Sequence, residues 1–78
     1  MVLAFPNMTK PFNVTTNASD YAIGAVLSQT DDNTAIKRPI MFLSESLGTT
    51  RSQYSVAEKE LYAIIVALRR FRPFIFGK

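Results

Sequence analysis

The sequence contains no cysteine and no histidine, and these two absences restrict its chemistry. Without cysteine the chain forms neither disulfides nor thiolate metal sites. Without histidine it lacks the base of Ser–His and Cys–His nucleophile pairs and the usual zinc ligand. Any metal ion would therefore be a hard cation held by oxygen ligands.

Long apolar runs are also missing. None reaches the ~20 residues that a membrane span needs. The first ten residues, MVLAFPNMTK, do not show the charged region and apolar core of a secretory signal. We therefore expect an intracellular protein, cytoplasmic or nuclear, without a membrane partner.

The composition that is present favours one small folded domain. The chain has 78 residues, of which 47% are hydrophobic, so a packed core is expected. The net charge of +3 is compatible with binding a polyanion, but many soluble domains carry as much charge without such a partner.

Alternating hydrophobicity predicts a strand at residues 12–18, and a short apolar run predicts a second at 21–29. Residues 38–47 are interpreted as a third strand. Pro39 predicts an edge position for the third, because proline cannot donate to a central ladder. Gly24 indicates close backbone approach or a bulge in the second. The short connections favour an antiparallel meander, with residues 1–12 extended or irregular and residues 48–54 forming a loop.

A long helix should follow. Ser55 and Glu58 form a capping-box pattern, nothing interrupts the helix from Val56 to Arg72, and Pro73 should end it. The spacing of five apolar residues predicts the face that lies on the sheet: Leu61, Ile64, Ile65, Leu68 and Phe71.

Glu60 does not fit this helix pattern. On a helical wheel it is flanked on both sides by apolar positions, whereas Glu58 lies among polar ones. A buried carboxylate is costly unless it is paired or binds a metal. Two interpretations remain open: Glu60 reaches water or an arginine where the helix overhangs the sheet, or it is a functional acid.

Three segments resemble a known family. FNVTTNASDYAIGAVLSQ, RPIMFLSESL and YSVAEKELYAIIVALRRFRPFIFG are similar to the ribonuclease H-like domain of reverse transcriptases from gypsy-type LTR retrotransposons. The resemblance covers nearly the whole chain. It implies a truncated ribonuclease H-like α+β fold, with a three-stranded antiparallel meander followed by one long helix packed on the sheet. In the family, this helix crosses over to a fourth, parallel strand.

The resemblance also implies an activity. Family members cleave the RNA strand of RNA–DNA hybrids, using acidic side chains that hold two magnesium ions. Residues 1–78 would form a single incomplete domain without the fourth and fifth strands and the later helices.

The family's catalytic positions can be placed on this sequence. Asn17 stands where the family has its first aspartate, and Glu60 stands at the second acid, where it would face the first strand across the helix–sheet packing. The remaining acids would follow FIFGK. Because asparagine is a neutral ligand and a single carboxylate cannot position two Mg²⁺ ions, we expect a vestigial site that binds no metal and cleaves nothing. Asp20 is either a turn residue, which we favour, or a substitute ligand.

The last residues of the chain are basic and aromatic. Arg69, Arg70 and Arg72 alternate with phenylalanines, a pattern that fits either nucleic-acid binding or a solvated helix face over a core. We favour the second interpretation, and retain weak binding of an RNA–DNA hybrid as the alternative.

Strand one raises a further expectation. Without a fourth strand it would present an open edge, which predicts a homo-oligomer formed by strand pairing or by exchange of the C-terminal tail. Three functions therefore remain open: an RNase H-like module without catalysis, a nucleic-acid-binding remnant, and a self-associating structural module.

Overall fold

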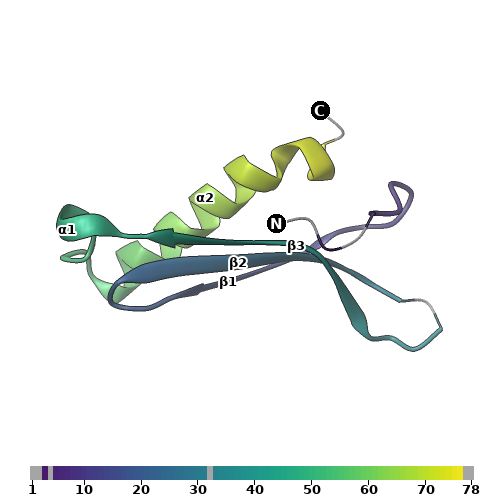
Figure 1. Ribbon diagram of the computed structural model, residues 1–78, viewed down its shortest axis with the longest axis horizontal. Helices are drawn as coiled ribbons and strands as arrows, with labels where there is room; N and C mark the ends of the chain where they lie inside the picture. The colour runs from purple at the N-terminus through teal and green to yellow at the C-terminus, as the bar shows by residue number, and fades with distance from the viewer. Residues whose placement is uncertain (1–2, 4, 32, 77–78) are drawn as a thin grey trace.

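The computed structural model describes residues 3, 5–31 and 33–76. It contains three strands, β1 (Asn13–Ala18), β2 (Ala22–Thr30) and β3 (Lys37–Ser46), and two helices, α1 (Gly48–Arg51) and α2 (Val56–Ile75). The strands pair antiparallel in the order β1-β2-β3 (Figure 1). The predicted meander and the α+β class are confirmed.

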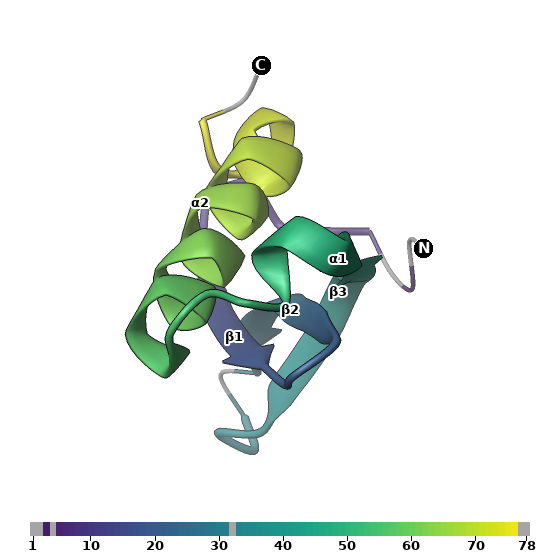
Figure 2. The ribbon, with the colours of Figure 1, turned by 90° about the vertical axis from the view of Figure 1, so that its left-hand side faces the viewer.

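Helix α2 lies across one face of the sheet, packed on β1 and β2. Figure 2 shows the same arrangement from the end of the molecule, and within the described residues no helix covers the opposite face. None of the described helices combines the length and the apolar composition needed to cross a membrane.

The core lies between α2 and the sheet in two groups. One joins Ala25, Leu27 and Ile40 to Ala67 and Phe71 of the helix. The other, nearer the start of the helix, consists of Ile23, Leu47, Ala63 and Val66. Burial of this apolar surface is the main contribution to the free energy of folding.

The predicted start of α2 is confirmed. The Ser55 hydroxyl accepts a hydrogen bond from the backbone N–H of Glu58 at 3.1 Å, and the Glu58 carboxylate accepts one from the N–H of Ser55 at 2.8 Å. These two bonds satisfy backbone donors that have no partner within the helix.

The predicted end of α2 is wrong, because the helix continues through Pro73 to Ile75. Proline's fixed φ is compatible with a helix, so its main cost here is one missing backbone donor. Phe74 and Ile75 pack against the Phe71 group of the core, and this burial favours the additional turn.

The predicted buried face of α2 is also wrong, except for Phe71. Four of its members are exposed, and the residues that face the sheet are Lys59, Ala63, Val66, Ala67 and Phe71. The segment LYAIIVAL is apolar on nearly every side, so periodicity alone could not select a face. The small side chains of Ala63 and Ala67 allow the helix to approach the sheet closely.

The predicted loop after β3 contains the short helix α1. It has no buried residue, and so no apolar periodicity marks it in the sequence. Gly48 adopts φ +72°, a backbone conformation that favours glycine and turns the chain out of β3.

The prediction for Pro39 is confirmed, because β3 is an edge strand. The register between β2 and β3 shifts between Leu27 and Ser28, where Ser28 is the partner of Pro39. The irregularity therefore lies opposite the residue that lacks a backbone donor, and not at Gly24.

Candidate functional site

Asn17 lies near the end of β1, on the sheet face opposite α2. Val14 and Ala18 pack against residues of the core beneath the helix. Because alternate residues of a strand point to opposite faces, Thr15 and Asn17 project from the other face, where both are exposed. Asn17 is paired with Gly24 across the ladder.

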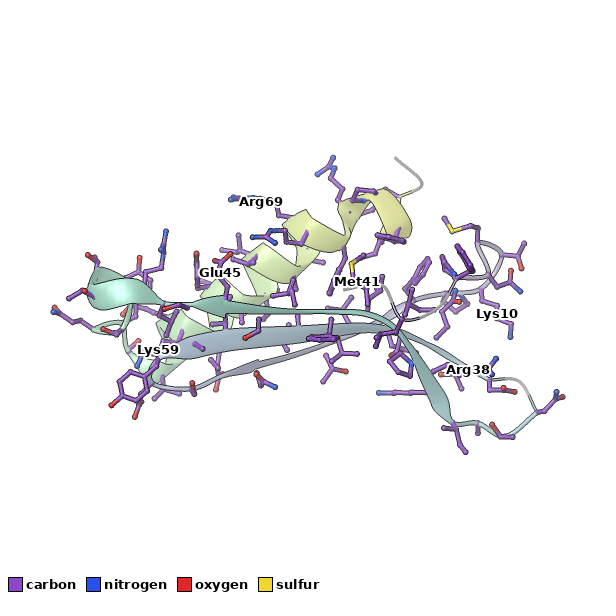
Figure 3. All side chains as sticks on the ribbon, viewed as in Figure 1. Lys10, Arg38, Met41, Glu45, Lys59 and Arg69 are labelled. Atoms are coloured by element: carbon purple, nitrogen blue, oxygen red, sulfur yellow. The ribbon has the colours of Figure 1, made fainter. Side chains whose placement is uncertain are left out.

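Glu60 is exposed on α2. Its neighbour Lys59 is buried and reaches the turn between β1 and β2, where its ammonium nitrogen lies 3.6 Å from a carboxylate oxygen of Asp20 (Figure 3). The first turn of α2 therefore lies above the end of β1 that carries Asn17. Asp20 lies between β1 and β2, as predicted for a turn residue.

The orientation of α2 on the sheet follows from the flank that faces β3. Tyr62 and Arg70 both reach Glu45 on β3, so their side of the helix faces β3. A helix advances ~100° per residue, which places Glu60 at an angle between the buried residues Ala67 and Phe71, although its own side chain, near the start of the helix, is exposed.

The two predicted catalytic positions thus occupy the same corner of the molecule but opposite sides of the sheet. Asn17 projects below it and Glu60 stands above it, exposed. Of the two interpretations left open for Glu60, its exposure agrees with the one in which the carboxylate reaches water, and its side chain is not packed between the helix and the sheet. On the helical wheel Glu60 lies between the buried residues Ala67 and Phe71, so the choice of helix face does not by itself account for its exposure.

This corner does not fit a two-magnesium centre. It supplies one carboxylate and one amide, whereas two Mg²⁺ ions need several carboxylates that converge. Over the described part of the chain, no three acidic, histidine or cysteine side chains are grouped as metal ligands would be. Asp20 is engaged by Lys59 at its turn.

A polar cluster that the sequence reasoning missed joins β3 to α2. Glu45 accepts hydrogen bonds of 2.9 Å from the Tyr62 hydroxyl and from the Arg70 guanidinium. The bond to Glu45 raises the pKa of Tyr62 above its ordinary value of 10.0, and burial adds to the shift. The alternation of residues along the strands could have indicated this cluster, because Glu45 pairs with the buried residue Ile23 and lies on the same face of the sheet.

The side chains at the basic end of α2 lie in three environments: the core, the Glu45 cluster and the surface. Phe71 is fully buried, in agreement with the interpretation that it is a core residue. The Arg70 guanidinium forms an ion pair with Glu45. Arg69 and Arg72 are exposed. The Arg72 guanidinium carbon lies 5.5 Å from the centroid of the exposed Phe76 ring.

A second basic surface lies at the opposite end of the sheet. A hollow of about 630 Å³ is lined by residues that include Lys10, Lys37, Arg38 and Asp31, and Figure 3 shows Lys10 and Arg38 at this end. The backbone N–H of Asn33 holds the pKa of Asp31 below its usual value, with a smaller contribution from Arg38. The Lys37–Arg38 pair beside Pro39 was the available sequence signal.

Comparisons with known proteins identify the family. A family model described as an RNase H-like domain found in reverse transcriptase matches residues 1–78. The chain belongs to this family. The resemblance found in the sequence is thereby confirmed, and the fold described above corresponds to part of an RNase H-like domain.

Curated relatives of this RNase H-like chain are retrotransposon polyproteins. It is 50% identical over 76 residues to the retrovirus-related Pol polyprotein from transposon opus of Drosophila melanogaster, covering 97% of the chain and 7% of the relative. It is 40% identical over 77 residues to that of transposon gypsy, with coverages of 99% and 7%. The Tf2-3 polyprotein of Schizosaccharomyces pombe is 36% identical over 74 residues, with coverages of 95% and 6%. The chain thus spans about 7% of the length of the first of these relatives.

Proposed function

We propose that this chain is a non-cleaving RNase H-like module of a retrotransposon Pol polyprotein, which binds RNA–DNA hybrid through the exposed end of α2. The family assignment rests on the match over residues 1–78. The absence of cleavage and the binding of hybrid are the proposal.

The observation that carries the first part is the pair of residues at the family's acidic positions. Asn17 supplies a neutral amide, and Glu60 is exposed on the other side of the sheet. Magnesium-assisted hydrolysis needs negatively charged ligands that hold the ions and lower the pKa of a bound water. An amide and one carboxylate on opposite sides of the sheet provide too little charge for this purpose.

The second part is supported by the side chains at the end of α2. Arg69 and Arg72 are exposed and available for phosphate contacts, and the exposed Phe76 ring offers an aromatic surface for stacking. Arg70 contributes less, because its guanidinium already binds Glu45. Binding through phosphates is expected to be independent of base sequence and to weaken as salt rises.

The test is fluorescence anisotropy of a labelled RNA–DNA hybrid at two salt concentrations in magnesium buffer, followed by a gel for cleavage. We expect salt-sensitive binding with intact RNA, both for the natural chain and for Asn17→Asp. Cleavage by the natural chain would overturn the first part of the proposal. Absence of binding at low salt would overturn the second.

A matched pair of variants locates the binding surface. Arg69→Glu with Arg72→Glu is expected to weaken binding by roughly tenfold or more, since two phosphate contacts are lost. Lys10→Glu with Lys37→Glu changes the net charge equally at the other end of the sheet and serves as the control. If the control loses affinity and the α2 variant does not, the proposed surface is wrong.

A further inference from the structure

Arg70, near the end of α2, has an acidic partner on β3. Its guanidinium nitrogen lies 2.9 Å from a carboxylate oxygen of Glu45, and the two side chains are 61% and 29% exposed. An ion pair that is open to water is weak, because solvent screens the attraction and two flexible side chains must be held in one geometry. Another oxyanion can therefore compete with Glu45 for this arginine.

The Glu45 carboxylate is also held by a second residue. The Tyr62 hydroxyl donates to the oxygen that Arg70 does not bind, at 2.9 Å. The Tyr62 ring is itself in contact with Tyr54, edge-on at 6.5 Å between centroids, and the Arg51 guanidinium carbon lies 4.8 Å from its centroid. The negative charge of Glu45 is thus fixed beside α2.

A carboxylate and a phosphate are equivalent ligands for arginine. The planar guanidinium has five N–H donors whose geometry suits the oxygens of either group. While Arg70 is paired with Glu45, its positive charge is largely neutralised and some of its donors are occupied. Glu45 therefore takes the place at Arg70 that a nucleic-acid phosphate would otherwise fill.

The pair borders the surface proposed to bind hybrid. Arg70 lies between Arg69 and Arg72 in the chain, and the three positions span about 5 Å along the helix axis. Arg69 follows Tyr62 by seven residues, or about two helical turns, so it lies on the flank of α2 that contacts Glu45. Glu45 therefore places a negative charge at the edge of a group of three arginines.

We propose that Glu45 competes with nucleic-acid phosphate for Arg70 and thereby limits the affinity of this end of α2 for RNA–DNA hybrid. The inference rests on the proposed function, since it concerns the same surface. Neutralising Glu45 releases Arg70 as a third phosphate-binding arginine beside Arg69 and Arg72. Because the long Arg70 side chain is already largely exposed, this release requires no change of the backbone.

The test is the affinity of the full chain for a labelled RNA–DNA hybrid, measured by fluorescence anisotropy over a series of salt concentrations. Glu45→Gln removes the charge and keeps the size of the side chain. We expect this variant to bind about threefold more tightly or better at low salt. The slope of log K against log salt should steepen by roughly 0.9, the value for one added phosphate contact.

A double variant tests whether the gain comes from Arg70. Glu45→Gln combined with Arg70→Gln has the same net charge as the natural chain, because one acid and one base are removed together. Its affinity and salt slope should return to those of the natural chain. A gain that persists without Arg70 would overturn the proposal.

Asp31→Asn is the matched control for charge. Asp31 pairs with Arg38 at 3.8 Å, so this variant also removes one negative charge and releases one arginine. Figure 3 shows Arg38 at the opposite end of the sheet from Glu45. Affinity and slope should stay unchanged, and a gain equal to that of Glu45→Gln would show a general effect of charge and overturn the proposal.

The outcomes separate this inference from the proposed function. A natural chain that binds, with a Glu45→Gln variant that binds no more tightly, overturns the inference alone. A natural chain that does not bind at low salt overturns the proposed binding, and the variant then decides the inference: binding by Glu45→Gln supports it, and no binding by either protein overturns it. Circular dichroism checks that each variant keeps the fold.

Discussion

The side-chain oxygen of Asn17 lies over Gly24, its partner across the β1–β2 ladder. A β-carbon placed on Gly24 would stand 2.8 Å from this oxygen and 3.6 Å from the carbonyl oxygen of Leu43. The missing side chain at position 24 therefore provides the space that Asn17 occupies. The close backbone approach predicted at Gly24 is therefore not what the structure shows, because the nearest group is the Asn17 side-chain amide.

Gly24→Ala should be tolerated. Asn17 is exposed and can rotate away from the added methyl group, the contact with Leu43 is an ordinary one, and Gly24 does not have a positive φ. Loss of glycine also restricts the unfolded chain, which stabilises the folded state by about 0.5 kcal/mol. Urea denaturation measures the change, and a loss above about 1 kcal/mol would show that Asn17 is fixed in place. The same substitution in an Asn17→Ala background is the control.

Truncation of the neighbouring side chains Lys59 and Glu60 should change the free energy of unfolding by different amounts. The side chain of Lys59 is 10% exposed, whereas its partner Asp20 is 84% exposed, so the lysine contributes mainly through packing of its aliphatic stem. We expect Lys59→Ala to destabilise the fold by about 1–2 kcal/mol and Glu60→Ala to change it by less than about 0.5 kcal/mol.

Chemical denaturation of the two variants, with Lys59→Met as the control, measures this difference. Methionine retains the length of the buried stem, so Lys59→Met should be close to neutral. A large loss on truncating Glu60 would instead reveal a structural partner for this carboxylate.

Tyr62 should make stability depend on pH in the alkaline range. Its folded-state pKa is raised, chiefly by the bond to Glu45, so its contribution is complete below the unfolded value of 10.0 and is lost as pH rises through the folded value. The stability difference between the natural chain and Tyr62→Phe should therefore shrink at high pH. Difference absorbance between the two proteins isolates the phenol titration, and a midpoint below 10.0 would contradict the assignment.

The side chain of Gln29 should hold residues 7–10, which precede β1, against the sheet through hydrogen bonds. Its buried side chain accepts a hydrogen bond from the Asn7 N–H at 2.9 Å and donates to the carbonyl oxygens of Asn7 and Lys10 at 2.7 and 3.3 Å. Gln29→Leu should cost about 1–2 kcal/mol. It should also accelerate amide hydrogen exchange in residues 7–10. Gln53→Leu, at an exposed position, is the control, and equal exchange in both variants would contradict this role.

Local patterns in the sequence were sufficient to predict most of the order of strands and helices. The alternation in β1, the capping box at Ser55 and the proline in β3 each depend on neighbours within a few residues, and the structure confirms them. The family resemblance rested on ordered segments and was confirmed over the whole chain. By contrast, α2 continues past Pro73 because Phe74 and Ile75 pack against the core. The residues around Pro73 give no information about this contact, since its partners are distant in the sequence.

The amino-acid sequence sets the chemistry that is available: no histidine or cysteine, an amide at position 17 and an acid at position 60. Where these groups point depends on the packing of α2 on the sheet. Residues 61–68 are apolar around most of the helix, so several faces could have been buried, and close packing of Ala63 and Ala67 on the sheet selected one of them. That selection turned the four aliphatic side chains of Leu61, Ile64, Ile65 and Leu68 outward, because a helix that buries one face must expose the opposite one.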